Sequence, residues 1–219
     1  GSYLKRAEAE RLFELCASRG LAVISDEVFA DYALTPDPRR LASTVADGPC
    51  LAFSLGGLSK SCGLPQLKLG WIAVSGPQRL RAEATARLEV IADTFLSVGT
   101  PVQQALPRLL ARLPELQAPI AARVRSNLGL LREALASPSP ASLLAAEGGW
   151  SAVLRVPATE PEEKLVLLLL ETEGVLVHPG FFFDFPTEAY LVLSLLPPTE
   201  VFARGVAGLL RHLGATAVL

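Results

Sequence analysis

The sequence predicts an α/β fold with a mainly parallel sheet, followed by a small α+β domain. Over the first half of the chain, helical segments alternate with short continuous apolar runs, which is typical of strands buried between helices. After the proline-containing segment at residues 138–140 the order changes, and two helices alternate with two or three strands. The 219 residues suffice for two modest domains. We therefore expect one domain over residues 1–118 and a second over residues 119–219.

The first domain is predicted to begin with an amphipathic helix over residues 4–19, which has apolar residues on one side and charged residues on the other. Gly20 is a suitable residue to end this helix. Residues 21–24 form a short apolar run, as in a strand that is buried on both faces of a parallel sheet. Two more strands and two helices are predicted at residues 51–53, 71–74, 77–96 and 102–113.

The second domain is predicted to follow a stretch in which Pro114 and Pro119 interrupt the helical pattern. A long helix is expected over residues 120–135, ending before the breaker Pro138-Ser139-Pro140. Beyond it, the sequence predicts strands at residues 151–156, 175–177 and 191–193, and helices at residues 160–173 and 199–213.

The composition argues against a membrane or nucleic-acid-binding protein. The longest dense apolar run, residues 165–170, is far shorter than the ~20 residues that a membrane-spanning helix needs, and no signal-peptide pattern opens the chain. The formal net charge is −2, without a basic stripe. The three cysteines are unclustered and lie among apolar residues, which favours reduced core thiols in a cytoplasmic protein. Scattered cysteines and two histidines give no pattern for a metal site.

Lys60 is the centre of the candidate chemistry. It ends the segment Gly56-Gly57-Leu58-Ser59-Lys60, and a second cation, Lys68, follows eight residues later. Upstream, Asp26 closes the first predicted strand, so both residues would lie at strand ends, where α/β proteins place their chemistry. An amine, a carboxylate, a hydroxyl and a cation suit pyridoxal 5′-phosphate, which is held as a Schiff base and acts as an electron sink. Asp26 would be a buried acid that balances the protonated pyridine nitrogen.

Each of these residues also has a plainer interpretation. Asp26 by itself would be a turn or capping aspartate. Lys60 by itself would be a solvated residue near a helix start, where Ser59 could cap the helix. We expect Glu27 to be a structural hydrogen-bonding residue rather than a catalytic one.

The segment around Lys60 resembles the lysine motif of class I/II aminotransferases, which is approximately Ser-x-Ser-Lys, then Gly-Leu, then a cation, an aliphatic residue and glycine. This chain has Gly57-Leu58-Ser59-Lys60, Gly63-Leu64 and Lys68-Leu69-Gly70 at matching spacing. The resemblance implies a fold-type-I enzyme, typically a homodimer, in which Lys60 and Asp26 are catalytic. It also implies which residues surround the cofactor: Asp26, Phe29, Ser59, Lys60 and Lys68, with Ser59 and Lys68 at its phosphate.

The chain departs from the family pattern at several positions. Lys68 stands where arginine is usual, so a point charge replaces a bidentate clamp. Gly57 stands where serine is common, and Phe29 where a tyrosine would reach the cofactor; Tyr32 is not assumed to substitute for it. The predicted last strand has no arginine for the substrate carboxylate, and Arg155 is a weak replacement.

Further along, Val177-His178-Pro179-Gly180-Phe181-Phe182-Phe183-Asp184-Phe185 resembles the Pro-Gly-x-x-Phe turn that closes over the substrate in this family. His178 and Phe181 are therefore candidate substrate contacts, as is Trp150 in a Gly-Gly-Trp segment. Their plainer interpretations are a hydrophobic turn between strands, a packed histidine and a packing tryptophan. The phenylalanines need burial, either in the core or against a substrate or a partner subunit.

The resemblance implies a reversible transfer of an amino group between an amino acid and a 2-oxo acid. A lyase or decarboxylase that uses the same cofactor is an alternative, and so is an inactive or sensor domain of the same fold. The chain contains no methionine, and we expect that an N-terminal half is absent. Weak or no cofactor binding by this chain alone is the corresponding expectation.

Overall fold

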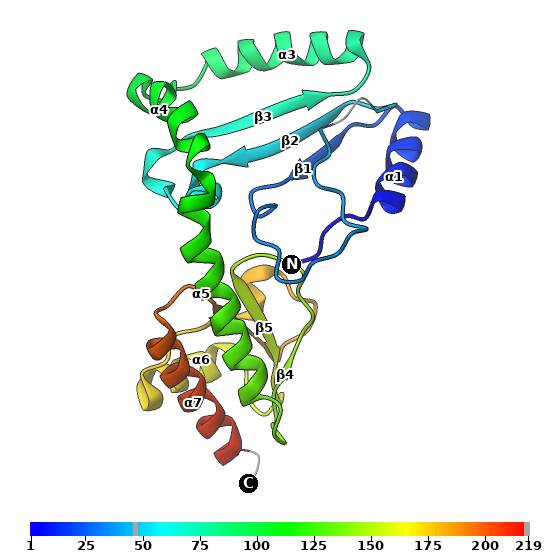
Figure 1. The fold of residues 1–219 in the computed structure, drawn as a ribbon. Helices are drawn as coiled ribbons and strands as arrows, with labels where there is room; N and C mark the ends of the chain where they lie inside the picture. Colours follow the sequence, from blue (N-terminus) through cyan, green and yellow to red (C-terminus); the bar gives the residue numbers. More distant parts are fainter. Residues whose placement is uncertain (46–47, 217–219) are drawn as a thin grey trace. The chain divides into compact units, whose positions relative to one another are not determined.

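The structure of the protein is a computed structural model that describes residues 1–45 and 48–216 (Figure 1). Contacts within the chain divide it into two compact units, Ser2–Ala118 and Gly1 together with Pro119–Leu219. The division falls inside helix α5 (Leu113–Ala134).

The N-terminal unit is built on a three-stranded mixed sheet in the order β1 (Val23–Asp26), β2 (Ala52–Gly57), β3 (Gly70–Ser75). Strands β1 and β2 are parallel, and β2 and β3 are antiparallel. A parallel return requires a crossover that is usually helical, whereas the segment between β2 and β3 contains only short helical turns, α2 (Leu58–Ser61) and η1 (Pro65–Leu67). All three predicted strands are therefore present, with the third reversed.

Helix α1 (Arg6–Ser18) confirms the first predicted helix. Its start is capped because the Glu8 carboxylate accepts a hydrogen bond from the Lys5 amide at 2.8 Å. Its end is followed by Gly20 at φ +63°, a left-handed conformation that glycine adopts without strain.

Strand β1 is not buried on both faces, which corrects the prediction made from its apolar run. Ile24 is 72 % exposed, and Asp26 is also exposed. Exposed and partly buried residues alternate along β1, so the face that carries Ile24 and Asp26 is not covered within the described residues. An apolar run therefore indicates a strand but not how completely that strand is covered.

The helices α3 (Gln78–Asp93), α4 (Thr100–Ala111) and α5 follow the sheet. The prediction that Pro114 and Pro119 interrupt the helical pattern is wrong, because α5 already begins at Leu113 and contains both. Pro114 lies in the first turn, where a backbone N–H would have no helical acceptor, and Pro119 removes only one internal hydrogen bond.

One hydrophobic core cluster of the N-terminal unit lies under α2. Its buried members are Leu58, Cys62 and Leu69, and the partly buried residues that pack on them come largely from α4 and the start of α5: Leu64, Leu67, Val98, Val102, Leu106, Leu109, Leu113 and Leu116.

The C-terminal unit contains an antiparallel four-stranded sheet in the order β4 (Ser142–Leu143), β5 (Ser151–Arg155), β7 (Tyr190–Ser194), β6 (His178–Pro179). The helices α6 (Glu162–Glu173) and α7 (Thr199–Thr216) confirm two predicted helices. Asn127 of α5 is fully buried, and its amide donates to the carbonyl oxygens of Leu195 and Pro197 at 3.0 and 2.9 Å.

The strand predicted at residues 175–177 is not formed, and the strand in this region is β6 instead. Gly174 ends α6 at φ +64°, and the amide of Val175 then donates to the carbonyl of Leu169 at 3.1 Å. The first residue of the predicted strand therefore completes the end of a helix, which leaves its amide unavailable for a ladder.

Cys16, Cys50 and Cys62 are free and buried, as expected for core thiols. None of the helices in residues 1–45 and 48–216 is long and apolar enough to cross a membrane. Within the same residues, no group of three or more His, Cys, Asp or Glu side chains is arranged to hold a metal ion.

Candidate active site

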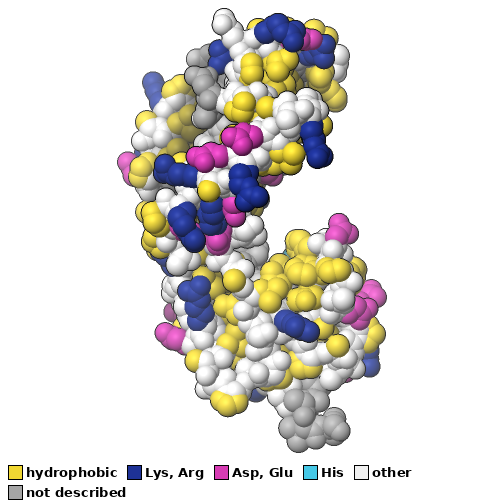
Figure 2. Space-filling view, turned by 90° about the vertical axis from the view of Figure 1, so that its right-hand side faces the viewer, with side chains coloured by type: hydrophobic (Ala, Val, Ile, Leu, Met, Phe, Trp, Pro, Cys, Tyr) yellow, Lys and Arg dark blue, Asp and Glu magenta, His cyan; other side chains and the backbone are white. Residues whose placement is uncertain are grey.

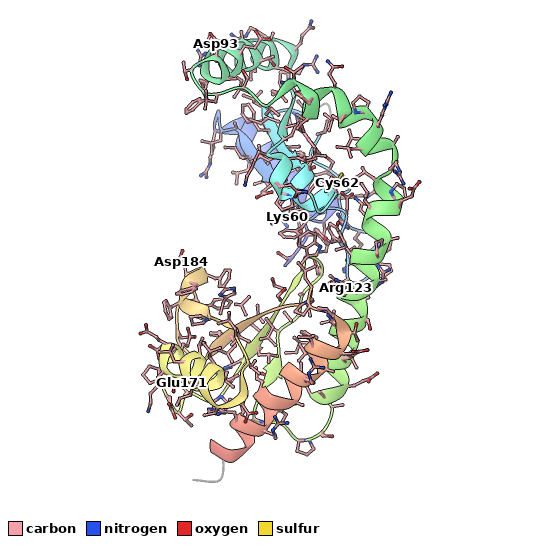
Figure 3. All side chains as sticks on the ribbon, turned by 90° about the vertical axis from the view of Figure 1, so that its left-hand side faces the viewer. Lys60, Cys62, Asp93, Arg123, Glu171 and Asp184 are labelled. Carbon is pink, nitrogen blue, oxygen red and sulfur yellow. The ribbon has the colours of Figure 1, made fainter. Side chains whose placement is uncertain are left out.

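Lys60 lies on α2, the short helix that follows β2 directly (Figure 3). The close approach of β3 explains the two glycines before it. A Cβ atom on Gly56 would lie 2.3 Å from the indole nitrogen of Trp71, and one on Gly57 would lie 3.2 Å from the carbonyl oxygen of Leu69. Glycine is therefore needed for β3 to pair along the full length of β2 and so bring α2 to its place at the strand end.

Two aromatic residues from the segment after β1 contact Lys60. The Tyr32 hydroxyl donates a hydrogen bond to the Lys60 carbonyl oxygen at 2.9 Å, and the Lys60 ammonium group lies 5.6 Å from the centre of the Phe29 ring. Burial, followed by the nearby Asp31 and Cys62, raises the pKa of Tyr32 to about 12. Tyr32 therefore remains a protonated donor at neutral pH and holds the backbone of Lys60.

Asp26 is exposed rather than buried, which corrects the expectation of a buried acid. It is the last residue of β1, paired in register with Leu55, and its Oδ1 accepts a hydrogen bond from the Val28 amide at 3.1 Å. The turn role that the sequence left open is thus present. Because β1 and β2 are parallel neighbours, their carboxyl ends lie at the same edge of the sheet. Asp26 is the last residue of β1, and Lys60 lies on α2, just beyond the carboxyl end of β2.

Glu27 is a structural residue, as expected. Its carboxylate accepts hydrogen bonds from the Ser43 hydroxyl at 2.6 Å and from the Thr44 amide and hydroxyl, each at 2.7 Å. The Thr44 hydroxyl also lies 2.6 Å from that of Ser54 on β2. Burial raises the pKa of Glu27, but the hydrogen bonds from Ser43, Thr44 and Ser25 outweigh it, so the pKa falls below the usual 4.5.

This network should make stability depend on acid pH. Since the pKa of Glu27 is lower in the folded protein, its contribution is complete above about pH 4.5 and is lost as the pH falls through the lowered value. We expect the difference in melting temperature between the wild type and Glu27→Gln to shrink between pH 7 and pH 3. Thermal unfolding monitored by circular dichroism measures it. A difference that stays constant over this range would contradict the assigned charge state.

A cavity of about 200 Å³ borders this part of the N-terminal unit. Its wall includes Gly56 and Ser61, which flank Lys60 in sequence, together with Trp71 and the acidic residues Glu27 and Asp31. The hydrogen-bonded loop after β1 and the lysine segment after β2 thus share one concave surface.

The C-terminal unit separates its three candidate residues. His178 lies on β6, and Phe181 lies in the turn η2 (Gly180–Phe183) that follows β6. The His178 ring is 6.1 Å from the ring of Phe182 and 6.1 Å from that of Phe183. Trp150 lies at the other end of β7, where its carbonyl accepts the Leu195 amide at 2.7 Å. The Phe181 turn adjoins Tyr190 and Trp150 is hydrogen-bonded to Leu195, so about 17 Å of strand separates them. His178, which pairs with Val192, lies between.

The turn phenylalanines are not buried within the described chain. Phe181, Phe182 and Phe183 are 47, 64 and 53 % exposed, and Figure 2 shows that hydrophobic side chains also gather on the surface of the C-terminal unit. The described residues 1–45 and 48–216 therefore do not bury these three rings in a core, and contact with a substrate or a partner subunit is the explanation that is left.

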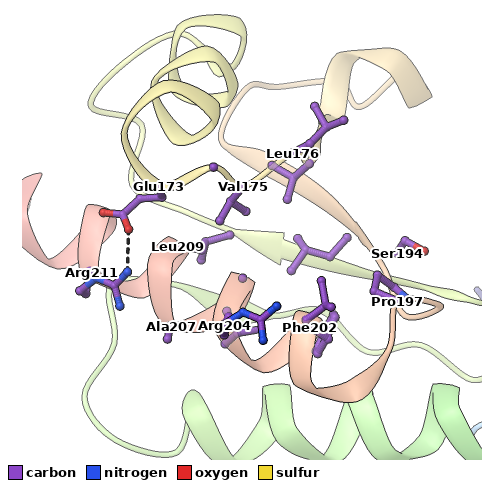
Figure 4. Close-up of a pocket in the computed structure, with 16 residues that line it drawn as sticks. Glu173, Val175, Leu176, Ser194, Pro197, Phe202, Arg204, Ala207, Leu209 and Arg211 are labelled. Carbon is purple, nitrogen blue, oxygen red and sulfur yellow. Dashed lines mark hydrogen bonds and ion pairs between the residues drawn. The ribbon is translucent and has the colours of Figure 1, made fainter.

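A larger pocket, of about 560 Å³, lies between α7 and the segment that joins α6 to β6 (Figure 4). Its wall is mostly apolar, and at its rim Arg211 forms an ion pair with Glu173 at 2.7 Å. It contains none of the candidate residues predicted from the sequence.

Two supporting residues were not predicted. Tyr32 contacts Lys60 across 28 positions of sequence, and Glu162 binds backbone amides 19 and 28 positions away. From the sequence alone, Glu162 is indistinguishable from an ordinary acidic residue in the first turn of a helix. Contacts of this range leave no periodic signal.

The residues of the N-terminal unit fit pyridoxal 5′-phosphate by their chemistry. The Lys60 amine lies beside an aromatic ring, Asp26 is the last residue of the neighbouring strand β1, and Ser59 lies on α2, directly after β2. Lys68, which adopts φ 52°, supplies a cation before β3. This set provides an amine, a counter-charge for the pyridine nitrogen and donors for a phosphate.

Known proteins resemble the chain throughout. The model of the family "Aminotransferase class I and II" matches residues 1–200. Alanine aminotransferase of Mycobacterium tuberculosis is 27 % identical over 216 residues, covering 93 % of this chain and 48 % of that protein. Arginine–pyruvate transaminase of Pseudomonas aeruginosa is 32 % identical over 204 residues, covering 91 % and 50 %. The chain thus spans about half the length of the curated relatives it matches.

Solved structures show the same fold. Tyrosine aminotransferase of Leishmania infantum superposes with a TM-score of 0.83 at 20 % identity, covering 98 % of this chain and 53 % of that one. Alanine aminotransferase of Pyrococcus furiosus gives 0.81 at 18 % identity, covering 96 % and 53 %. Together with the family match over most of its length, these findings show that the chain belongs to the pyridoxal-phosphate-dependent class I and II aminotransferases.

Proposed function

We propose that this chain supplies the C-terminal part of an aminotransferase that exchanges an amino group between an amino acid and a 2-oxo acid. Residues 1–118 would belong to the cofactor-binding large domain and residues 119–219 would form the small domain. The observation that carries the proposal is the placement of Lys60 immediately after β2, whose parallel neighbour β1 ends at Asp26. The family match and the names of its relatives support the same reaction.

Each residue has a role in this proposal. Lys60 would hold the cofactor covalently and, once released, carry a proton to and from the substrate carbon. The bound cofactor supplies the electron sink for this chemistry. Asp26 would stabilise the protonated pyridine nitrogen, and Ser59 and Lys68 would bind the phosphate. Phe29 offers an aromatic face to the Lys60 amine but no hydroxyl group.

The substrate side of the site is proposed for the C-terminal unit. His178 lies on β6 and Phe181 in the turn η2 that follows it, while Trp150 lies at the far end of β7. Strand β7, Tyr190–Ser194, carries no arginine for a substrate carboxylate. The family is typically homodimeric and cytoplasmic, and we propose both for this protein.

The test uses the protein expressed from its full coding sequence. Pyridoxal phosphate is added, the Schiff base is reduced with borohydride, and peptides are mapped by mass spectrometry. The modified residue should be Lys60, and a modification elsewhere would contradict the proposal. Consumption of 2-oxo acid, measured against release of ammonia, sulfide or carbon dioxide, separates amino transfer from the alternative lyase and decarboxylase reactions.

A further inference from the structure

Glu162 is buried and binds two backbone amides, one in the turn that contains Phe181 and one at the start of β7. One carboxylate oxygen accepts a hydrogen bond from the Phe181 amide at 2.9 Å, and the other accepts one from the Tyr190 amide at 2.7 Å. Only 2 % of Glu162 is exposed. The carboxylate therefore joins the start of α6, the turn η2 and the first residue of β7.

Gly180 shows how closely the turn is packed against this carboxylate. A Cβ atom at position 180 would lie 2.8 Å from the Cβ of Tyr190 and 3.0 Å from an oxygen of Glu162. Such distances leave no room for a side chain at position 180. Glu162 thus holds the backbone of η2 by a hydrogen bond, while the rings of Phe181, Phe182 and Phe183 remain exposed.

An exposed aromatic surface on a fixed backbone suits contact with a ligand, because little freedom remains to be lost on binding. We propose that Glu162 is a positioning residue that holds Phe181 and its turn in place against the substrate. This inference rests on the proposed function, since the substrate contact belongs to it. The hold on the turn does not depend on that function.

Substituting glutamine for Glu162 changes the hydrogen-bonding groups of the side chain while keeping its shape. Glutamine has the size of glutamate, but its amide offers one oxygen and one NH₂ group, so one of the two backbone amides would face another donor. Removing an acceptor from a buried donor is costly. We expect Glu162→Gln to release one end of the turn without opening a cavity. Glu163, exposed on the same helical turn, provides the matched control Glu163→Gln.

Chymotrypsin, which cleaves after phenylalanine, measures the release of the turn directly. Cleavage at residues 181–183 of the full-length protein should be about tenfold to a hundredfold faster in Glu162→Gln than in the wild type. In steady-state kinetics the KM for the amino acid should rise by a similar factor, with kcat per Lys60 adduct unchanged. Glu163→Gln should match the wild type in both measurements.

Other outcomes would overturn the inference. Unchanged cleavage means that Glu162 does not hold the turn, and faster cleavage with an unchanged KM means that the turn does not contact the substrate. A lower kcat at constant KM indicates a general structural role. If Glu162→Gln does not fold, Glu162→Asp, which keeps the charge but is one methylene shorter, takes its place with the same readouts. If the wild type forms no adduct at Lys60, the proposed function fails, and cleavage still reports the hold on the turn.

Discussion

Replacing Lys60 with alanine should abolish covalent attachment of pyridoxal phosphate and lower the rate of amino transfer by at least a factor of about 10² to 10⁴. That range is typical of the loss of a positioned proton-transfer group. The covalent function of the amine is lost in addition. Borohydride reduction followed by peptide mapping measures attachment, and single-turnover kinetics measure the rate.

Lys68→Ala is the matched control for this experiment. It removes a cation from the same segment, but one assigned to the phosphate rather than to covalent attachment. Loss of one charge-assisted hydrogen bond should weaken cofactor binding about 10- to 150-fold while the adduct still forms on Lys60 at saturation. If the two variants behaved alike, the distinct roles assigned to the two lysines would be wrong.

Leu58→Ala should destabilise the protein by about 2 to 5 kcal/mol, the usual cost of removing a fully buried leucine side chain. Leu58 is 0 % exposed and opens the helix that carries Lys60. Its amide also donates to the Leu69 carbonyl at 3.0 Å, which joins α2 to the residues before β3. The midpoint of urea unfolding measures the loss.

Leu110→Ala, on the surface of α4, provides the comparison. Leu110 is 36 % exposed, so the same substitution there removes fewer contacts and should cost well under the loss at Leu58. Equal losses at the two sites would show that the core under α2 does not dominate the stability of this unit.

The sequence predicted the parts of the site that depend on local pattern. Lys60 could be singled out because glycine, serine and a second lysine stand at characteristic short distances from it in the sequence. The strands could be predicted because they are short apolar runs. Asp26 was correctly placed at a strand end. Its exposure was not predicted, because burial depends on which other parts of the structure cover that face of β1.

Long-range contacts account for what could not be predicted. The hydroxyl of Tyr32 and the carboxylate of Glu162 form hydrogen bonds with backbone groups far away in sequence. Neither the residue type nor the spacing in the sequence predicts such a contact. The misplaced strand at 175–177 has a different cause. The end of α6 uses the Val175 amide, and this competition between helix capping and strand pairing is decided by the three-dimensional structure.

The indole of Trp71 lies against Gly56, four residues before Lys60, whereas Trp150, the second of two tryptophans, belongs to the other unit. Trp71 is therefore a natural fluorescent reporter in the unit that carries Lys60. We expect a chromophore attached to Lys60 to quench the Trp71 emission by energy transfer, so that loading can be followed in real time without a label. A Trp150→Phe background would isolate that signal.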